Sequence, residues 1–407
     1  MPKVVHVQKD VLSGGRAALR LHEAFLDTGI ESFILSLFKD INDSERVIKT
    51  GKLSRILAKT DFKVQSFLRR KIKPDFGLYS FPLLGTDISK LPVIKEADLV
   101  YLNWVQGGFL NLSNYRQLFR LGKPVVLVMH DMWTITGGCH HSFTCLKYTS
   151  GCKDCPMFAE SKTIDWPERE FHKKSNLYKE SKNIYFVSPS KWLFNCSKNS
   201  FLLKEKPVFH IPNVVNSKIF KPVDRKFARQ VLNINQEENV IGFGAMSINS
   251  PYKGWEELKK ALLLLRDYRS DKELSVLIFG GEYNKTIADS IPFRTHFLGF
   301  LKDEYSTSLV FNALDVFVSP SLADNLPTTI LECLSCGTPV TGFNVGGIPD
   351  MIDHKKNGYL AKYRDSEDLA LGIRFCLESR IKGWLLPEFE KGNIMKKHSE
   401  LFDFITK

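Results

Sequence analysis

Residues 315–350 read DVFVSPSLADNLPTTILECLSCGTPVTGFNVGGIPD, and this segment has the strongest signals for secondary structure in the chain. The apolar run at 315–318 is short and rich in β-branched and aromatic residues, which predicts a buried parallel strand. Pro327 suits the first position of a helix, and no helix breaker follows before Gly337. A second apolar run at 340–343 predicts the next strand. In such a strand–helix–strand unit, ligands lie beyond the carboxyl ends of the strands.

Two acidic residues flank the start of the predicted helix. Asp324 lies in the loop before the helix, and Glu332 lies about a turn and a half into it. Amides in the first turn of a helix attract anions, and carboxylates accept hydrogen bonds from sugar hydroxyls. The pair therefore suits a ligand with both phosphate and sugar; alternatively, Asp324 is a capping residue and Glu332 a solvated acid. The residues expected to surround the anion are Pro327, Thr328, Thr329 and Ile330.

The same stretch resembles the signature of family 4 retaining glycosyltransferases. That family has a PS pair, E-x7-E, G-x-P-V and a G-G-x-P-E turn, which match residues 319–321, 324–332, 337–340 and 346–350. The resemblance implies an α/β protein of the GT-B fold, with two facing Rossmann-like domains and the nucleotide-sugar donor in a central cleft. Asp replaces Glu at positions 324 and 350, which leaves the donor sugar open.

The length of 407 residues predicts two domains of similar size. Residues 209–222 resemble the interdomain connection of the family. We predict an N-terminal acceptor-side domain over residues 1–214, a C-terminal nucleotide-sugar-binding domain over 215–391, and a tail, 392–407, that crosses back onto the first domain. No apolar run approaches the ~20 residues that span a bilayer, and none resembles a signal peptide, so we expect a cytoplasmic protein.

Two features of the N-terminal half are candidates for ligand binding. Gly14 and Gly15 lie between a predicted strand and helix, where glycines let amides approach a phosphate or simply form a tight turn. The resemblance implies that they face the donor diphosphate. His130 ends the predicted strand 124–129, and the resemblance implies a His that approaches the transferred sugar, although a lone His is otherwise a structural residue.

In the C-terminal half, Lys253 precedes an amphipathic helix and can bind a diphosphate as a point charge. The family commonly supplies an Arg several residues earlier, but Ala245, Ser247 and Asn249 occupy that region here, so Arg16 is the candidate to replace it. Gly299 and Leu301 lie in a segment that resembles the loop that holds the nucleotide base. The resemblance requires no metal for catalysis.

Four cysteines fall within one glycine-containing loop. Cys152 and Cys155 have the C-x2-C spacing of a zinc knuckle, and Cys139 with Cys145, or a neighbouring His, could complete a structural zinc site. Alternatively, all four are reduced thiols, because disulfides are rare in a reducing cytosol.

The net charge of +12 predicts an anionic partner, and much of the excess lies in residues 45–73. This segment alternates basic and apolar residues and could lie on an anionic membrane, or it could be a solvated helix that covers the core. No nucleic-acid-binding motif is present, so nucleic acid is not an expected partner.

Together these features predict a retaining hexosyltransferase that uses a UDP- or GDP-sugar and a lipid-linked or oligosaccharide acceptor. Synthesis of exopolysaccharide, capsule or lipopolysaccharide at the inner face of the cell membrane is the expected setting. The alternatives are a nucleotide-sugar epimerase or a phosphorylase of the same architecture, or a non-catalytic donor-binding subunit. Turnover without an acceptor would indicate an epimerase, bound pyridoxal phosphate a phosphorylase, and no turnover a binding subunit.

Overall fold

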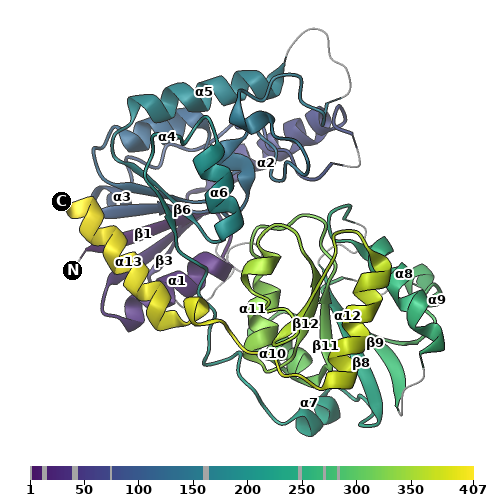
Figure 1. Ribbon diagram of the computed structural model, residues 1–407. Coiled ribbons are helices and arrows are strands. Elements are labelled where there is room, and N and C mark those ends of the chain that lie inside the picture. Colours follow the sequence, from purple (N-terminus) through teal and green to yellow (C-terminus); the bar gives the residue numbers. More distant parts are fainter. Residues whose placement is uncertain are drawn as a thin grey trace. The chain divides into compact units, whose positions relative to one another are not determined.

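The computed structural model describes residues 2–11, 16–38, 45–73, 76–158, 165–245, 250–268, 272–281 and 285–407 (Figure 1). Contacts between Cα atoms divide the chain into two units. The N-terminal unit comprises residues 1–214 with 391–407, and the C-terminal unit comprises residues 215–390. Gly14 and Gly15 lie outside the described residues, so their expected role stays a prediction.

The N-terminal unit contains a parallel sheet in the order β3-β2-β1-β4-β5-β6-β7. Its strands are β1 Lys3–Gln8, β2 Glu31–Ser36, β3 Val47–Lys49, β4 Leu99–Leu102, β5 Val125–Val128, β6 Ile184–Ser188 and β7 Val208–His210. Its helices are α1 Arg16–Asp27, α2 Lys52–Arg69, α3 Pro92–Lys95, α4 Leu112–Phe119, α5 Trp166–Glu180, α6 Lys191–Asn199 and α13 Lys391–Thr406, and the 3-10 turns are η1 Met132–Ile135 and η2 Lys147–Thr149.

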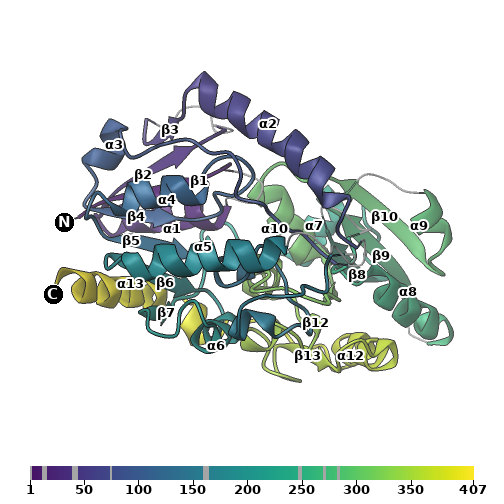
Figure 2. The ribbon, with the colours of Figure 1, turned by 90° about the horizontal axis from the view of Figure 1, so that it is seen from above.

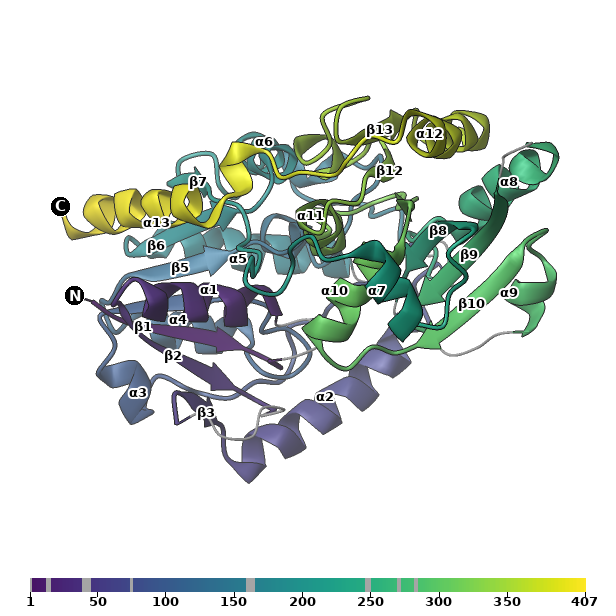
Figure 3. The ribbon, with the colours of Figure 1, turned by 90° about the horizontal axis from the view of Figure 1, so that it is seen from below.

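Helices cover both faces of this sheet. One face packs against α3, α4, α5 and α6, and the other packs against α1 and α13 (Figures 2 and 3). All four residues of β5 are buried, which explains why this strand is uniformly apolar rather than alternating. The final helix, α13, belongs here because Ile394 and Leu401 are fully buried and His398 Nδ1 lies 3.0 Å from the Tyr101 hydroxyl.

The C-terminal unit contains a second parallel sheet in the order β10-β9-β8-β11-β12-β13. Its strands are β8 Glu238–Gly244, β9 Glu273–Phe279, β10 Arg294–Gly299, β11 Val316–Ser319, β12 Val340–Phe343 and β13 Gly358–Ala361. Its helices are α7 Arg225–Val231, α8 Trp255–Leu264, α9 Lys285–Asp289, α10 Glu304–Ala313, α11 Thr328–Ser335 and α12 Ser366–Ser379, with 3-10 turns η3 Leu265–Asp267, η4 Ile348–Asp350 and η5 Pro387–Phe389.

Helices α8 and α12 cover one face of the second sheet, and α7, α10 and α11 cover the other. The order of strands reverses between β8 and β11, which lie side by side although two strands separate them in sequence. In open parallel sheets a crevice forms at such a reversal, beyond the carboxyl ends of the two strands. The loops after β8 and β11 therefore border the expected ligand site.

Candidate active site

An ion pair joins the loops that follow β8 and β11. Lys253 Nζ lies 2.8 Å from Asp324 Oδ2, and both side chains are largely buried. Burial alone lowers the pKa of Lys253, but the carboxylate of Asp324 outweighs it and the net shift is upward, so the ammonium is charged throughout the neutral range. A fixed cation is thus held beyond the carboxyl ends of the two strands at the reversal of strand order.

A glycine conformation and two close backbone contacts place Lys253. Gly254 has φ of +68°, and a Cβ there would lie 1.8 Å from the carbonyl oxygen of Pro320. The amide of Leu322 donates to the carbonyl of Tyr252 at 2.8 Å. Only glycine allows the two loops to approach this closely, so Gly254 sets the position of the lysine before it.

The other side of the Asp324 loop is held by a second glycine turn. Gly346 has φ of +58°, and a Cβ there would lie 1.9 Å from the backbone oxygen of Asp324. The amide of Gly347 donates to the same oxygen at 3.2 Å. The glycine turn of the sequence signature therefore has a mechanical role: it fixes the backbone that carries Asp324.

The first turn of α11 presents backbone amides beside this ion pair. Pro327 is the residue before the helix rather than its first residue, and in the described part of the chain no side chain caps this end. The Ile330 amide, however, donates to the Pro327 carbonyl at 3.0 Å, whereas an anion site needs a free amide; the expected contact of Ile330 with an anion stays a prediction. Thr328 and Thr329 begin the helix and are partly exposed, so their amides remain the candidates for phosphate binding.

Glu332 is not the solvated surface acid that one interpretation of the sequence allowed. Only 5% of its surface is exposed, and the neighbouring residues of α11, Ile330, Leu331, Cys333 and Leu334, are buried as well, so this part of the helix is enclosed on all sides. A buried carboxylate is costly unless it has a function or partners. The alternative interpretation of Asp324 is also wrong, because its carboxylate pairs with Lys253 rather than capping α11.

The carboxyl ends of β8, β9 and β10 meet next to this site. Gly280 follows β9 and donates its amide to the Gly299 carbonyl at 2.7 Å. A Cβ at Gly280, whose φ is +94°, would lie 2.9 Å from the Ala245 oxygen, whereas a Cβ at Gly299 would meet nothing within 4 Å. Gly299 therefore borders open space, while Leu301 packs partly against the hydrophobic core. Residues 246–249, which belong to the region where the family commonly has an Arg, lie outside the described residues.

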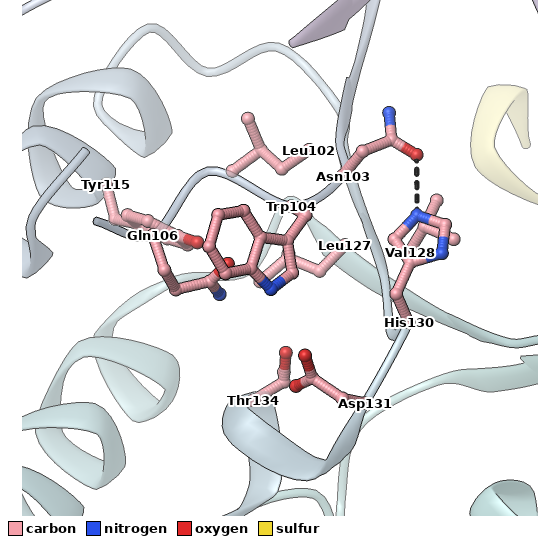
Figure 4. Close-up of a pocket in the computed structure, with 10 residues that line it drawn as sticks. All are labelled: Leu102, Asn103, Trp104, Gln106, Tyr115, Leu127, Val128, His130, Asp131 and Thr134. Carbon is pink, nitrogen blue, oxygen red and sulfur yellow. Dashed lines mark hydrogen bonds between the residues drawn. The ribbon is translucent and has the colours of Figure 1, made fainter. Parts of the chain in front are cut away.

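In the N-terminal unit, His130 lies just beyond β5 and lines a small polar pocket (Figure 4). Its Nε2 lies 3.0 Å from Asn103 Oδ1, and burial lowers its pKa to about 4, so the imidazole is neutral at pH 7. Trp104, Asp131 and Thr134 also line this pocket, with the carboxylate of Asp131 and the hydroxyl of Thr134 directed toward the same space as the indole (Figure 4).

A buried hydrogen-bonded chain orients Asp131. His140 Nδ1 lies 2.6 Å from Asp131 Oδ2, and His140 Nε2 lies 2.8 Å from Ser80 Oγ. Burial raises the pKa of Asp131, but His140 and the amide of Trp133 outweigh that effect and hold it below its ordinary value. Asp131 is therefore an acceptor for hydrogen bonds, like the sugar-binding carboxylates of many sites.

Sequence reasoning missed Asn103 and Gln106, which line the same pocket. Both are buried, and in the described part of the chain Asn103 Nδ2 and Gln106 Oε1 find no hydrogen-bond partner. Asn103 directly follows β4, and β4 pairs with β5, so the signal was the position of two polar residues at neighbouring strand ends. An unpaired donor and an unpaired acceptor in one pocket suit a polar ligand with hydroxyl groups.

The structure does not support the predicted zinc site. Among the residues that it describes, no three His, Cys, Asp or Glu side chains are grouped so that they could hold a metal ion. Cys139 packs with Tyr79, Phe81 and Met157, and the Cys152 sulfur accepts a hydrogen bond from the Gly137 amide at 3.2 Å. Burial raises the pKa of Cys139, Cys152 and Cys155, which opposes the thiolate form that binds zinc.

Comparison with known proteins identifies the C-terminal half. The sequence pattern described as "Glycosyl transferases group 1" matches residues 224–391. Over these residues the chain carries the pattern of the group 1 glycosyltransferases. The family predicted from the sequence signature is thereby confirmed.

Curated relatives align with this chain over a length similar to that of the family match. The chain is 28% identical over 175 residues to D-inositol 3-phosphate glycosyltransferase of Mycobacterium marinum, which covers 40% of this chain and 36% of the relative. It is 30% identical over 179 residues to the protein of that name from Saccharomonospora viridis, with 41% of each covered. The match thus spans well under half the length of these relatives.

Solved structures resemble the whole chain. HepE from Anabaena, in complex with UDP and glucose, has a TM-score of 0.60 at 16% identity and covers 100% of both chains. Sucrose-phosphate synthase from Thermosynechococcus elongatus has a TM-score of 0.62 at 16% identity, with 100% of this chain and 99% of that chain covered. The two parallel α/β sheets are those of the GT-B fold, as predicted.

Proposed function

We propose that this group 1 glycosyltransferase moves a hexose from a nucleotide-sugar donor to a hydroxyl of a glycan or lipid-linked acceptor, with retention of configuration. The observation that carries the proposal is the Lys253–Asp324 pair, held between two glycine turns at the reversal of strand order and next to the start of α11. A cation, helix amides and a buried carboxylate together match a ligand that has both a diphosphate and a sugar.

In this proposal the C-terminal unit stabilises the departing diphosphate. The bond between the anomeric carbon and a diphosphate oxygen breaks, and a bond to the acceptor oxygen forms on the same face of the sugar. The acceptor proton passes to the diphosphate oxygen, so no protein nucleophile is required. Negative charge grows on the diphosphate during this step, and Lys253 with the Thr328 and Thr329 amides would bind it more tightly as it develops.

Glu332 and Asp324 have different parts in this mechanism. Glu332, as a buried carboxylate on α11, would accept hydrogen bonds from hydroxyls of the donor sugar and hold the anomeric carbon in place. Asp324 would orient the Lys253 ammonium, which it contacts at 2.8 Å. Gly299 would let the backbone after β10 approach the nucleotide, because nothing lies within 4 Å of a Cβ at that position.

The N-terminal unit would bind sugar hydroxyls through the pocket beside His130. Neutral His130, ionised Asp131 and the amides of Asn103 and Gln106 provide both donors and acceptors. Gly14, Gly15 and Arg16 stay candidates for contact with the diphosphate. Synthesis of a surface polysaccharide at the inner face of the cell membrane is the setting that we propose.

A donor screen tests the proposal. Because a ligand that binds the folded state raises the melting temperature, UDP-glucose, other UDP-sugars and GDP-mannose should be compared by thermal shift. UDP-glucose comes first because the HepE structure that contains it shares this fold. We expect one nucleotide sugar to raise the melting temperature and to yield free nucleotide only when an acceptor is present. A protein that no nucleotide sugar stabilises would refute the proposal, and turnover without an acceptor would instead indicate an epimerase or a hydrolase.

A further inference from the structure

Helix α2 of the N-terminal unit turns its polar side inward. Its buried residues are Ser54, Ala58, Asp61 and Gln65, which recur every three or four positions and so form one stripe. Asp61 Oδ1 accepts a hydrogen bond from the Leu84 amide at 3.0 Å, and Arg69 Nε donates to the Tyr79 carbonyl at 3.0 Å. The contact with the rest of the unit is therefore made mainly by polar groups.

Close backbone packing completes this contact. The φ of Gly108 is +83°, and a Cβ there would lie 2.6 Å from the Cα of Ala58. Gln65 Oε1 accepts from the Phe81 amide at 3.3 Å and from Arg69 Nη2 at 3.2 Å. The inward stripe thus fixes α2 against the segment 79–84 and the loop at Gly108, and Leu68 adds an apolar contact with the cluster that contains Tyr79 and Phe81.

The outward face of α2 is apolar. Leu53, Ile56, Phe62 and Phe67 each expose 59–68% of their surface, and Val64 exposes 41%. With 3.6 residues per turn, Leu53, Ile56, Val64 and Phe67 fall on one exposed side of the helix, away from the buried stripe, whereas Phe62 lies on another side. A soluble surface rarely gathers so many large apolar side chains, and such a patch marks an interaction site.

A row of cations borders this apolar face. Lys52, Lys59, Lys63 and Arg70 are exposed and recur every four or seven positions, and Lys71 and Lys73 extend the charge beyond the helix. Asp61 is the only acidic residue between positions 52 and 73, and it is buried. The exposed surface of the segment therefore combines cations and apolar side chains with the hydroxyls of Thr60 and Ser66, and it carries no acidic side chain. Figure 2 shows α2 as a straight helix at the edge of the N-terminal unit, outside the helices that cover the sheet.

From this arrangement we infer that α2 is a docking surface for an anionic membrane leaflet, on which it lies parallel to the surface. The cations attract the lipid headgroups, while Ile56, Phe67 and their neighbours enter the boundary between headgroups and acyl chains. Charge complementarity favours a lipid surface over a second copy of the chain, because two copies would bring like charges together. In the described part of the chain no helix is long and apolar enough to span a membrane, so the contact would be reversible.

Binding to vesicles tests this inference in the full chain. Vesicles of phosphatidylcholine alone should be compared with vesicles of equal parts phosphatidylcholine and phosphatidylglycerol by co-sedimentation. We expect binding only to the anionic vesicles and weaker binding at high salt. The change of Lys52, Lys59, Lys63 and Arg70 to Gln should weaken binding by roughly several hundredfold, since each of the four cations near the surface contributes about fivefold.

Matched controls locate the effect on α2. Lys226, Lys260, Lys285 and Lys382 are exposed in the C-terminal unit, and their change to Gln removes the same charge elsewhere. Ile56→Ser with Phe67→Ser should reduce binding, whereas Phe227→Ser with Leu371→Ser, which removes apolar side chains that are 56% exposed on the C-terminal unit, should not. All variants should keep the melting temperature of the unaltered chain.

Three results would overturn the inference. The first is equal binding, or no binding, of the unaltered chain to neutral and anionic vesicles. The second is an equal loss of binding in the α2 variants and their controls, which would mean that net charge alone drives adsorption. The third is a dimer that the α2 variants dissociate while vesicle binding stays unchanged, which would assign the face to a second copy. Donor affinity should be the same in all variants, so failure here leaves the proposed function untouched.

Discussion

The change of Lys253 to Met offers a direct test of the diphosphate site. Met keeps the length of the side chain and removes its charge, and it fits the partly buried space between the two loops. A hydrogen bond to a charged group contributes about 1.5–3 kcal/mol, so affinity for UDP should fall about 10- to 150-fold. The loss should lie toward the upper end, because the site is largely shielded from solvent and the ammonium is fixed by Asp324.

Calorimetric titration with UDP and with uridine separates the effect on phosphate from an effect on the fold. The variant should lose affinity for UDP and keep its affinity for uridine, which has no phosphate. Lys260→Met is the matched control, since Lys260 lies in α8, the helix that follows Lys253, and its side chain is exposed to solvent. Unchanged affinity for UDP would refute the reasoning, and an equal loss for UDP and uridine would show that the change disturbs the loop rather than the charge.

Further predictions concern catalysis, loop geometry and acid stability. Glu332→Gln should lower turnover about 10- to 150-fold with the fold intact, because the amide loses a charge-assisted hydrogen bond; steady-state kinetics and a melting curve check this. Gly254→Ala should lower donor affinity although Lys253 remains, because its Cβ would meet the Pro320 oxygen; titration with UDP checks this. Burial lowers the pKa of His22 and His130 to about 4 and that of His398 to about 3. The free energy of unfolding of the N-terminal unit should therefore fall by about 2 kcal/mol per histidine between pH 7 and pH 5.

The sign of the acid effect follows from linkage. Each of these histidines has a folded-state pKa below the unfolded value of about 6.5, so the unfolded chain binds protons first as the pH falls. Stability is therefore fully present above pH 6.5 and is lost as the pH falls toward 4. Denaturant melts at pH 7 and pH 5 measure this, and His398→Gln, which keeps an acceptor for Tyr101, should make the dependence shallower. A dependence as steep as that of the unaltered chain would contradict the assignment to His398.

Undisturbed turnover in Glu332→Gln would show that its carboxylate makes no contact in the transition state. An affinity for UDP in Gly254→Ala equal to that of the unaltered chain would show that the loop relaxes around the methyl group. The two variants address different parts of the site, since one changes a charge without moving the backbone and the other moves the backbone without changing a charge.

Much of the C-terminal unit could be predicted from the sequence because its signals are local. The apolar run at 340–343 coincides with β12, and the absence of breakers between Pro327 and Gly337 predicted α11. Short, fully buried parallel strands need apolar residues on both faces, so they are visible without knowledge of their neighbours. The GT-B fold followed from the same local signature.

The partners of polar groups were decided by tertiary structure. Lys253 and Asp324 are far apart in sequence, so the 2.8 Å contact between Lys253 Nζ and Asp324 Oδ2 could not be predicted. That contact depends on β8 and β11 lying side by side. The same holds for His130 and Asn103, whose strands are neighbours in the sheet. The cysteine spacing was misleading for the opposite reason: proximity in sequence did not bring the thiols into a metal-binding group among the described residues.

Helix α2 shows most clearly what each level determines. The combination of cations with apolar side chains in residues 45–73 is visible in the sequence, but whether the apolar side faces the core is not. Packing decided this, because Asp61 and Gln65 find hydrogen-bond partners on the backbone of 79–84 and Ala58 fits closely against Gly108. Buried polar groups are costly unless they are hydrogen-bonded, and these partners allow the polar stripe to face inward while Leu53, Ile56, Val64 and Phe67 stay exposed.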